Sequence, residues 1–480
     1  MKLLYRSLIL LSAVVFGSLN SQAQSLKIDI KLENVSDSSA YLAHYLDGRI
    51  FADDTTKLVN GVGLFEKDSL LDQGIYVIYL PSQKYFDLLI GNDQEFSITS
   101  DSVDFVNKLQ ITGSDESEAF AGFQKFMKAK TESNRKLQEE YKDKADDEKA
   151  KAEYRERFKK ADLEVKAYIK ALNEKFPKPS FVSSFANFTL SSEAPDFEKS
   201  IAADFPNRDK EIKLRNYLWT KDHYFSNLNP ADDRYLRTPL LKNKLEFFFE
   251  KVLIQQPDSI IKESVKLIEQ ARPNKTCFQY YTQYALNYAI KSKTMGVDAA
   301  FVDLAKRYYL SGQATWADST LMANIKERVI KLQYNLLDMK AQDLALETID
   351  GEFVKLHELD ANYTVLYFFE TDCGHCKKVT PRLKTEILDA YKDLGVQVMA
   401  VYTQQKKDEW QKYIEDNVLY DFVNCYDPNY QTNFRIFYDV YSTPTIYLLD
   451  KNKKIIAKRL DIENLKGFLN HERKRKAEKS

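Results

Sequence analysis

The sequence predicts a multidomain protein: a small antiparallel β domain, then an all-α domain, then an α/β domain. Three observations lead to this fold class. Apolar and polar residues alternate in short runs from Leu26 to about Gly113, the period becomes helical at Ser114, and a strand-like apolar run returns at 363–369. The 480 residues suffice for three domains that each bury a core. The predicted ranges are 1–23 for a signal peptide, then 24–114, 115–338 and 339–480 for the domains.

Residues 1–23 have the features of a signal peptide. Lys2 and Arg6 precede an apolar run that ends at Phe16, and Ser21-Gln22-Ala23 has the small-x-small form of a cleavage site. The apolar run is well short of the roughly 20 residues that span a bilayer, which disfavours a membrane anchor. No cysteine follows the cleavage site, so a lipoprotein anchor is unsupported. We expect a periplasmic or otherwise exported protein.

Charge and cysteine content narrow the function further. The 70 basic and 71 acidic residues give no overall field, so nucleic acid is not an expected partner. Four cysteines in an exported chain of this length, with one close pair, indicate a redox centre rather than a disulfide-stapled scaffold. Cys277 and Cys425 are interpreted as small core residues, and a bridge between them stays open.

The first domain is predicted from runs such as LKIDIKL, GIYVIYL and EFSITS, which turn residues separate. Asp47-Gly48 and Asn60-Gly61 are two of these turns, so the pattern indicates a sandwich or barrel. It contains no cluster of chemically active residues. His44 is its only histidine and is interpreted as structural.

The helical domain begins with an apolar stripe and continues into a highly charged stretch. Residues 128–175 are about half charged with mixed signs, which predicts a long solvated helix or helical hairpin. A coiled coil with another protein is disfavoured because the apolar stripe does not sustain heptads. Aromatic segments such as CFQYYTQY are expected to face the helical core. A linker is predicted near Asp338 to Leu344, and we expect residues from about Met339 onward to fold alone.

The chemistry is expected where the strand YTVLYFF meets a helix. Glu370 to Asp372 lead from that strand into Cys373-Gly374-His375-Cys376, and apolar residues then recur at helical spacing to Tyr391. A thiol at a helix start faces unpaired N–H groups and the positive end of the helix dipole, which favour thiolate. Cys373 is therefore the predicted nucleophile. Cys376 follows one turn later and is the predicted resolving thiol.

The rest of the last domain completes an α/β pattern. VQVMAVYT is predicted as a second parallel strand, KKDEWQKYIEDN as a crossover helix, and TPTIYLLDKNKKIIAKRL as a hairpin that turns at Lys451-Asn452. A final helix, IENLKGFLNHERKRK, closes the domain. Its basic end complements a helix C-terminus.

These motifs resemble the thioredoxin superfamily. Pro381 falls five residues after the second cysteine, where thioredoxins kink this helix, and Thr443-Pro444 precedes TIYLL, where they carry a cis-proline facing the disulfide. The resemblance covers roughly Leu344 to Leu469, and TIDGEFVKLHEL looks like the opening hairpin of the TlpA-like branch, which is related to the AhpC/TSA proteins. The segments HYFSNLNPADDRYLRTP and MGVDAAFVDLAKRYYLSGQATWAD resemble a helical domain of unknown function that precedes TlpA-like modules, together with a β domain.

The resemblance implies a thioredoxin-like fold and an exported thiol-disulfide oxidoreductase that reduces or isomerises protein disulfides. Its only redox group would be the Cys373–Cys376 disulfide, with no separate cofactor or metal. The partners implied are protein thiols and disulfides and a membrane electron donor of the disulfide-reductase type, and no oligomeric state is indicated. Thr443 would offer its backbone N–H and C=O to an extended substrate, while Pro444 fixes the turn.

Two positions depart from the thioredoxin pattern. Asp372 stands where thioredoxins usually have tryptophan, and Tyr367 stands where thioredoxin has a buried aspartate. The usual proton relay is therefore missing, and Glu370 is the nearby carboxylate that could replace it. Gly374-His375 is the pair found in protein disulfide isomerase, so we expect a potential between roughly −180 and −270 mV.

Three alternatives stay open. A C-x-x-C pair is also half of a structural zinc site, although no second ligand pair follows at a compatible spacing. A thiol peroxidase of the alkyl-hydroperoxide type has Thr371 in its favour, but such enzymes expect a proline-led loop where this chain has Tyr367. The third is a partner-binding protein in which the two N-terminal domains act and the redox domain is secondary. An insulin-reduction assay on the last domain and on the whole chain would discriminate it from the oxidoreductase.

Overall fold

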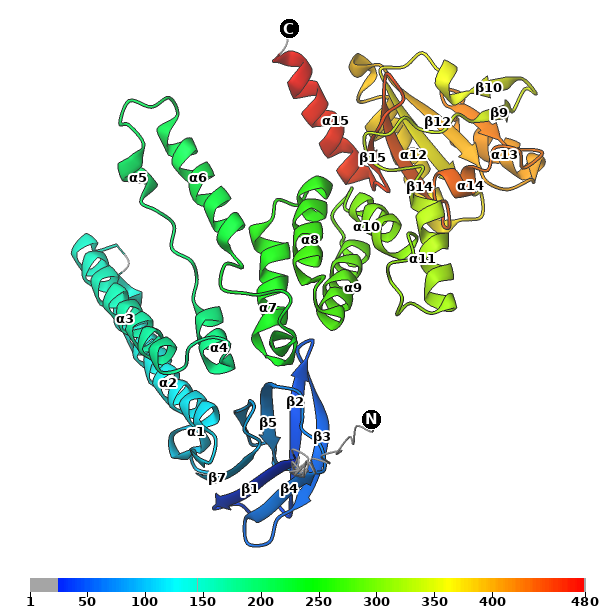
Figure 1. Ribbon diagram of the computed structural model, residues 1–480. Helices are drawn as coiled ribbons and strands as arrows, with labels where there is room; N and C mark the ends of the chain where they lie inside the picture. The colour runs from blue at the N-terminus through cyan, green and yellow to red at the C-terminus, as the bar shows by residue number, and fades with distance from the viewer. Residues whose placement is uncertain (1–24, 145, 479–480) are drawn as a thin grey trace, which may run out of the picture. The chain divides into compact units, whose positions relative to one another are not determined.

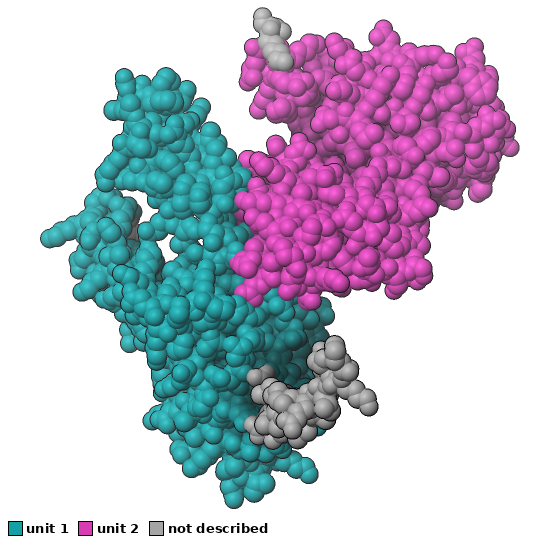
Figure 2. Space-filling model, viewed as in Figure 1, with its two compact units in different colours: residues 1–228, 233–245 teal, residues 229–232, 246–480 magenta. Residues whose placement is uncertain are grey.

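The computed structural model describes residues 25–144 and 146–478, so the predicted signal peptide lies outside the described residues. The chain forms two compact units (Figure 2): Met1–Leu228 with Asp233–Leu245, and Asn229–Asp232 with Glu246–Ser480. The predicted helical domain is thus shared between the two units, and the three domain ranges remain predictions. Within the described residues, no helix is both long and apolar enough to cross a bilayer.

A β-sandwich opens the first unit, as the alternating runs predict (Figure 1). Its two four-stranded sheets have the orders β4-β1-β7-β8 and β3-β2-β5-β6. Every second residue of β1, from Leu26 to Leu32, is buried between the sheets. The strands are β1 (Leu26–Glu33), β2 (Ser39–Leu46), β3 (Arg49–Lys57), β4 (Val62–Lys67), β5 (Gly74–Tyr79), β6 (Tyr85–Ile90), β7 (Glu95–Asp101) and β8 (Gln110–Thr112).

One strand pair departs from the antiparallel prediction. β1 and β7 run parallel, with Lys27 opposite Glu95 and Ile30 opposite Ile98. The other pairs of both sheets are antiparallel. Strand direction across 60 or more residues of intervening chain depends on the path of that chain, which the local alternation of residues does not encode.

The change of period at Ser114 is the start of a helix. The Ser114 hydroxyl accepts a hydrogen bond from the N–H of Ser117, so it caps α2 (Asp115–Tyr141). α2 and α3 (Glu148–Lys175) form the predicted charged hairpin, with ion pairs such as Arg157–Glu140 between them. Shorter helices follow, namely α4 (Phe181–Thr189), α5 (Phe197–Ser200), α6 (Arg208–His223) and α7 (Leu240–Phe247), while α1 (Phe105–Lys108) lies before α2.

Four helices of the second unit precede its sheet. Their aromatic residues face inward, as predicted: Phe278, Tyr281 and Tyr308 are buried. Cys277 is fully buried among them. The helices are α8 (Pro257–Ala271), α9 (Lys275–Lys291), α10 (Asp298–Leu304) and α11 (Ser319–Leu332).

A seven-stranded mixed sheet forms the C-terminal α/β fold. Its order is β10-β9-β13-β12-β11-β14-β15, with β11, β12 and β13 parallel and β14 antiparallel to β11. The predicted second parallel strand and the predicted hairpin are therefore confirmed. The strands are β9 (Ala345–Thr348), β10 (Phe353–Lys355), β11 (Tyr363–Phe369), β12 (Val396–Tyr402), β13 (Val423–Tyr426), β14 (Thr445–Asp450) and β15 (Ile455–Lys458).

Helices cover both faces of this sheet. α12 (Gly374–Arg382), α13 (Lys407–Asn417) and α15 (Ile462–Ala477) bury one face, where Tyr367 and Phe369 of β11 point. α14 (Phe434–Phe437) and residues 341–356 bury the other, where Leu366 and Phe368 point. The alternation along β11 thus divides one apolar strand between two cores, as expected for a central strand.

The prediction that Asp338 to Leu344 form a linker is wrong, because the backbone of this segment is hydrogen-bonded to the last hairpin. The N–H of Asp338 donates to Ile455 O at 2.9 Å, and the N–H of Ala341 donates to Lys453 O at 2.8 Å. Ala341 and Leu344 are buried. β15 is an edge strand with free backbone groups, and this polar segment satisfies some of them. The segment therefore belongs to the α/β fold.

Candidate active site at the start of helix α12

Cys373 and Cys376 lie where β11 passes into α12, as the sequence predicts. Cys373 is the N-cap residue of α12, and its Sγ accepts a hydrogen bond from the N–H of Cys376 at 3.1 Å. Cys373 is partly exposed, whereas Cys376 is fully buried. Both cysteines are free thiols, so this is a dithiol geometry. The accessible sulfur is the one that receives an N–H of the first helical turn.

The pKa values of the two thiols are shifted in opposite directions. Burial works to raise the pKa of the Cys373 thiol, but hydrogen bonds from the side chain and backbone of Cys376 outweigh it, so this pKa lies below its ordinary value. Burial, followed by the hydrogen bond to Cys373, raises the pKa of the Cys376 thiol to about 12. Since only a thiolate is a good nucleophile, Cys373 is the sulfur prepared to attack.

Thr443 and Pro444 face the dithiol from the loop before β14. The Thr443–Pro444 peptide bond is cis, as the resemblance implies. The Cys373 thiol donates a hydrogen bond to the Thr443 carbonyl at 3.3 Å. The carbonyl that the sequence assigns to substrate binding is therefore next to the accessible sulfur.

A cluster of three hydroxyl groups lies beneath the buried thiol. Tyr367 Oη and Thr380 Oγ1 are 2.8 Å apart, and Tyr413 donates to Thr380 Oγ1 at 3.0 Å. Tyr367 and Thr380 are fully buried. Burial is the main cause that raises the pKa of the Tyr367 phenol, and a hydrogen bond to Cys376 raises it further. The phenol therefore stays protonated. A protonated hydroxyl can hydrogen-bond to the Cys376 sulfur but cannot act there as a carboxylate base.

The other predicted site residues lie around the dithiol in different settings. Glu370 follows β11: its carboxylate accepts a hydrogen bond from Thr403 Oγ1 at 3.0 Å, and a hydrogen bond from its backbone works to lower the pKa of the Cys376 thiol. His375 and Pro381 are exposed, and Pro381 lies inside α12 just before a π-helical segment at Leu383–Leu388. A Cβ added at Gly374 would meet no atom within 4 Å, so packing does not require glycine there.

Sequence reasoning missed two members of the hydroxyl cluster. Thr380 lies four residues after Cys376, so its place on the same helix face could have indicated it. Tyr413 comes from α13, and no local signal connects it with the cysteines. The sequence singles out Tyr367 only because it stands in place of the thioredoxin aspartate. In the structure its hydroxyl belongs to the cluster and bonds with Thr380 Oγ1.

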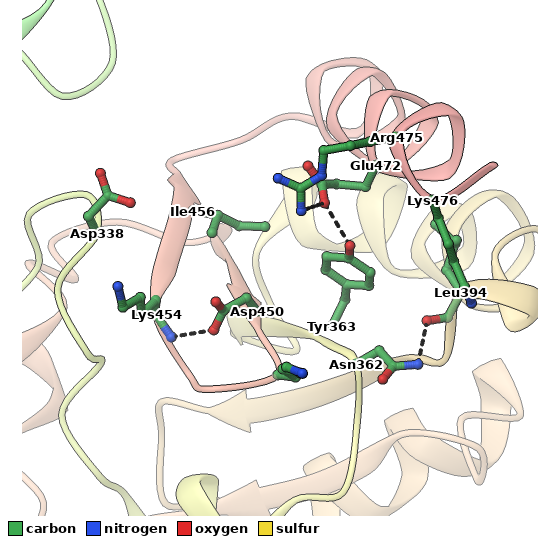
Figure 3. A pocket seen from close by; sticks show the side chains of 11 residues that line it. Asp338, Asn362, Tyr363, Leu394, Asp450, Lys454, Ile456, Glu472, Arg475 and Lys476 are labelled. Carbon is green, nitrogen blue, oxygen red and sulfur yellow. Dashed lines mark hydrogen bonds and ion pairs between the residues drawn. The ribbon is translucent and has the colours of Figure 1, made fainter. Parts of the chain in front are cut away.

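The remaining cysteines and a pocket of the second unit lie apart from the dithiol. Cys277 and Cys425 are buried on α9 and β13, and burial raises the pKa of Cys425. The pocket lies beside the start of β11, whereas Cys373 follows the end of that strand (Figure 3). Its polar groups pair with each other, since Tyr363 donates to Glu472 at 2.7 Å. The described residues hold no group of three or more candidate metal ligands.

Comparisons with known proteins concern the region of the chain that contains this site. Residues 337–458 match the model of the AhpC/TSA family. A thioredoxin-like protein of Haemophilus influenzae is 30% identical over 111 residues, which are 23% of this chain and 62% of that protein. The thiol-disulfide oxidoreductase ResA of Oceanobacillus iheyensis is 27% identical over 127 residues, which are 26% of this chain and 64% of ResA. This chain thus spans less than two thirds of the length of both relatives.

Among solved structures, one similar chain is a domain of a possible thiol-disulfide isomerase from Cytophaga hutchinsonii. It is 40% identical, with a TM-score of 0.28, and the match covers 29% of this chain and 94% of that domain. The family match at residues 337–458 lies in the C-terminal α/β fold, and the curated relatives match about a quarter of the chain.

Proposed function

We propose that the chain is an exported thiol-disulfide oxidoreductase with a TlpA-like C-terminal domain of the thioredoxin superfamily, and that it reduces or isomerises protein disulfides. A thioredoxin-like redox activity is supported by the named thiol-disulfide oxidoreductases among the relatives. The reaction with protein disulfides is supported by the pairing of a partly exposed, low-pKa Cys373 with a fully buried Cys376 one turn away.

The first step uses the accessible sulfur. Cys373 thiolate attacks one sulfur of a substrate disulfide, a new S–S bond joins Cys373 to the substrate, and the other substrate sulfur leaves as a thiolate that takes a proton from water. The N–H of Cys376 stabilises the attacking thiolate before the reaction. The Thr443 carbonyl, at 3.3 Å from Cys373 Sγ, accepts an N–H of an extended substrate segment when that segment displaces the thiol.

The second step uses the buried sulfur. Cys376 loses its proton and attacks Cys373 Sγ, so the mixed disulfide breaks and the substrate leaves as a thiol. Two electrons have then passed from the dithiol to the substrate, and the protein holds a Cys373–Cys376 disulfide. The Tyr367 hydroxyl stabilises negative charge on Cys376 during this attack, a role that a buried carboxylate could not fill in the same way.

Repeated turnover needs a dithiol donor. We assign this role to a membrane electron donor of the disulfide-reductase type, which would reduce the Cys373–Cys376 disulfide by the reverse exchange. Export of the chain to the periplasm is part of the same proposal, and it is supported by the signal-like residues 1–23. The potential is proposed to lie between roughly −180 and −270 mV.

Insulin reduction by the purified chain, with dithiothreitol as donor, tests the proposal. We expect turnover by the wild-type chain and loss of all catalysed reduction in Cys373→Ser. Cys425→Ser is the matched control, because Cys425 is a buried thiol of the same sheet and should leave the rate unchanged. A Cys373→Ser variant that still reduces insulin would contradict the assignment.

A further inference from the structure

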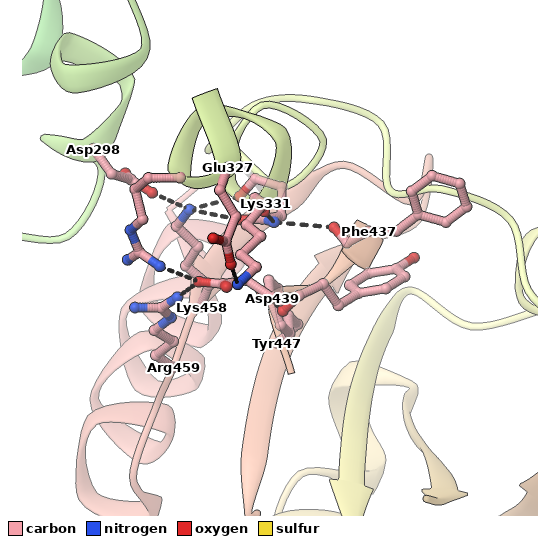
Figure 4. Close-up of polar contacts among 11 residues, drawn as sticks. Asp298, Glu327, Lys331, Phe437, Asp439, Tyr447, Lys458 and Arg459 are labelled. Atoms are coloured by element: carbon pink, nitrogen blue, oxygen red, sulfur yellow. Dashed lines mark hydrogen bonds and ion pairs between the residues drawn. The ribbon is translucent and has the colours of Figure 1, made fainter. Parts of the chain in front are cut away.

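The loop that carries Thr443 is held by a helix that lies outside the α/β fold. This loop, residues 438–444, connects α14 with β14 and ends in the cis bond beside Cys373. Helix α11 contacts it and the end of α14 (Figure 4). α11 and the α/β fold belong to the same compact unit.

The first contact is an ion-pair cluster at the start of the loop. The Asp439 carboxylate has no exposed surface, and its Oδ2 accepts a hydrogen bond from Arg328 of α11 at 3.3 Å. Arg459, which follows β15, pairs with the same oxygen. A carboxylate without solvent contact depends on such partners, because an unpaired buried charge is strongly unfavourable. Asp439 also has a φ of 50°, so its backbone is held in a conformation that few residues adopt.

Two further residues, one in α11 and one just after it, contact the loop and the end of α14. Lys331 Nζ lies 4.0 Å from the ring centre of Tyr441, two residues before Thr443. Asn335, just after α11, is fully buried and donates to the Phe437 carbonyl at 3.0 Å. Three residues one helical turn apart, at 328, 331 and 335, thus contact positions 439, 441 and 437.

The contact with Tyr441 restrains an otherwise exposed residue. Tyr441 is 59% exposed, and the Lys331 cation covers one face of its ring. Inside the α/β fold, Tyr447 donates to the Tyr438 carbonyl at 2.5 Å, and Val440 is buried with its N–H bonded to Arg435 O at 3.0 Å. The side chains of Asp439 and Tyr441, by contrast, are contacted by α11, with Arg459 as the second cation on Asp439.

We propose that Arg328 and Lys331 of helix α11 are positioning residues for the substrate-binding loop, so that the helical region sets how well a protein disulfide docks on Thr443. This inference rests on the proposed oxidoreductase function. It assigns no chemistry to α11, because its residues act through Asp439 and Tyr441. Substrates too small to use the loop should not sense the change.

The test compares Arg328→Met and Lys331→Met in the full chain with Lys326→Met, which replaces an exposed lysine of the same helix. For insulin, we expect KM to rise about tenfold in Arg328→Met and less in Lys331→Met, with kcat within about twofold. The alkylation rate of Cys373 by iodoacetamide should stay unchanged. Arg328→Lys, which keeps the charge, should have a KM for insulin close to that of the wild type.

Hydrogen exchange gives a readout that does not need activity. The amides of residues 438–446 should exchange faster in Arg328→Met than in the wild type or in Lys326→Met, while the amides of β11 keep their protection. If the wild-type chain failed to reduce insulin, the proposed function would fall, and hydrogen exchange would still decide whether α11 holds the loop. Unchanged exchange in both Arg328→Met and Lys331→Met would overturn the inference, as would a loss confined to kcat.

Discussion

The two faces of the seven-stranded sheet each bury one cysteine, and only one of these residues has a partner thiol. Cys376 lies in the core under α12, and Cys425 lies in the core on the opposite face. Both are fully buried and burial raises the pKa of both thiols. Cys425 contacts the Ala400 carbonyl, whereas Cys376 shares a helix start with the partly exposed Cys373. Burial makes a thiol inert, and only the helix start beside it creates a redox pair.

The largest effect is expected from removing the resolving thiol. Cys376→Ser leaves the Cys373 nucleophile intact but stops the second exchange, so the variant should accumulate mixed disulfides with its substrates. Intact-mass spectrometry after non-reducing purification measures this. Cys425→Ser, the matching change on the other face, should trap nothing. Equal trapping by the two variants would remove the distinction between the faces.

The face that buries Cys425 also contacts residues that precede the α/β fold. Lys458, beside the face of Cys425, is buried, and it pairs with Asp298 and donates to the Asn335 carbonyl at 2.7 Å. A fragment that starts at Met339 lacks both partners. We expect it to be less stable than a fragment of residues 246–480 by about 1.5–3 kcal/mol, the usual contribution of a hydrogen bond to a charged group. Urea titrations of the two fragments measure the difference, and equal midpoints would show that the α/β fold is complete without the helices.

A buried tyrosine on each face gives a smaller and more specific comparison. Tyr367→Phe removes the hydroxyl beneath Cys376 and should slow release of the mixed disulfide about three- to tenfold, in line with the ~0.5–1.5 kcal/mol of one hydrogen bond. Tyr447→Phe removes the corresponding hydroxyl of the other face, which donates to Tyr438 O. It should lower stability without slowing release. Stopped-flow measurement of the second exchange discriminates the two variants.

The smallest expected change concerns the exposed residue between the cysteines. A cationic His375 would stabilise the Cys373 thiolate, so His375→Pro should make the potential more negative by some tens of millivolts, where about 30 mV equals about 1.4 kcal/mol. A glutathione titration of both proteins measures the shift. No shift, or a shift in the oxidising direction, would mean that His375 is a spacer and that the potential is set elsewhere.

Much of the α/β fold follows from local signals. The apolar run of β11 and the helix that starts at the cysteine pair are each contained in a short segment, so periodicity predicts their places. The cis Thr443-Pro444 step was expected from the resemblance to thioredoxins. The alternation before Ser114 predicts the sandwich in the same way. Local patterns are sufficient where the structure is determined within one element.

The features that escaped prediction join distant segments. The parallel pairing of β1 with β7, the docking of residues 338–344 on β15, and the approach of Tyr413 to Thr380 all depend on how far-apart pieces of chain meet. Glu370 was the natural replacement for the missing aspartate by sequence distance. Its engagement with Thr403, which follows β12, could not be foreseen from its own segment.

The central claim is that Cys373 carries the reactive thiolate and that the two thiols buried on the two faces of the sheet, Cys376 and Cys425, stay protonated. Alkylation of the reduced chain by limiting iodoacetamide, followed by peptide mass spectrometry across a pH series, tests it directly. Because the pKa of Cys373 is lowered and that of Cys376 is raised to about 12, Cys373 should be modified first at every pH, starting near pH 6, with Cys376 and Cys425 protected in the folded chain. Modification of Cys376 before Cys373 would reverse their roles and contradict the account.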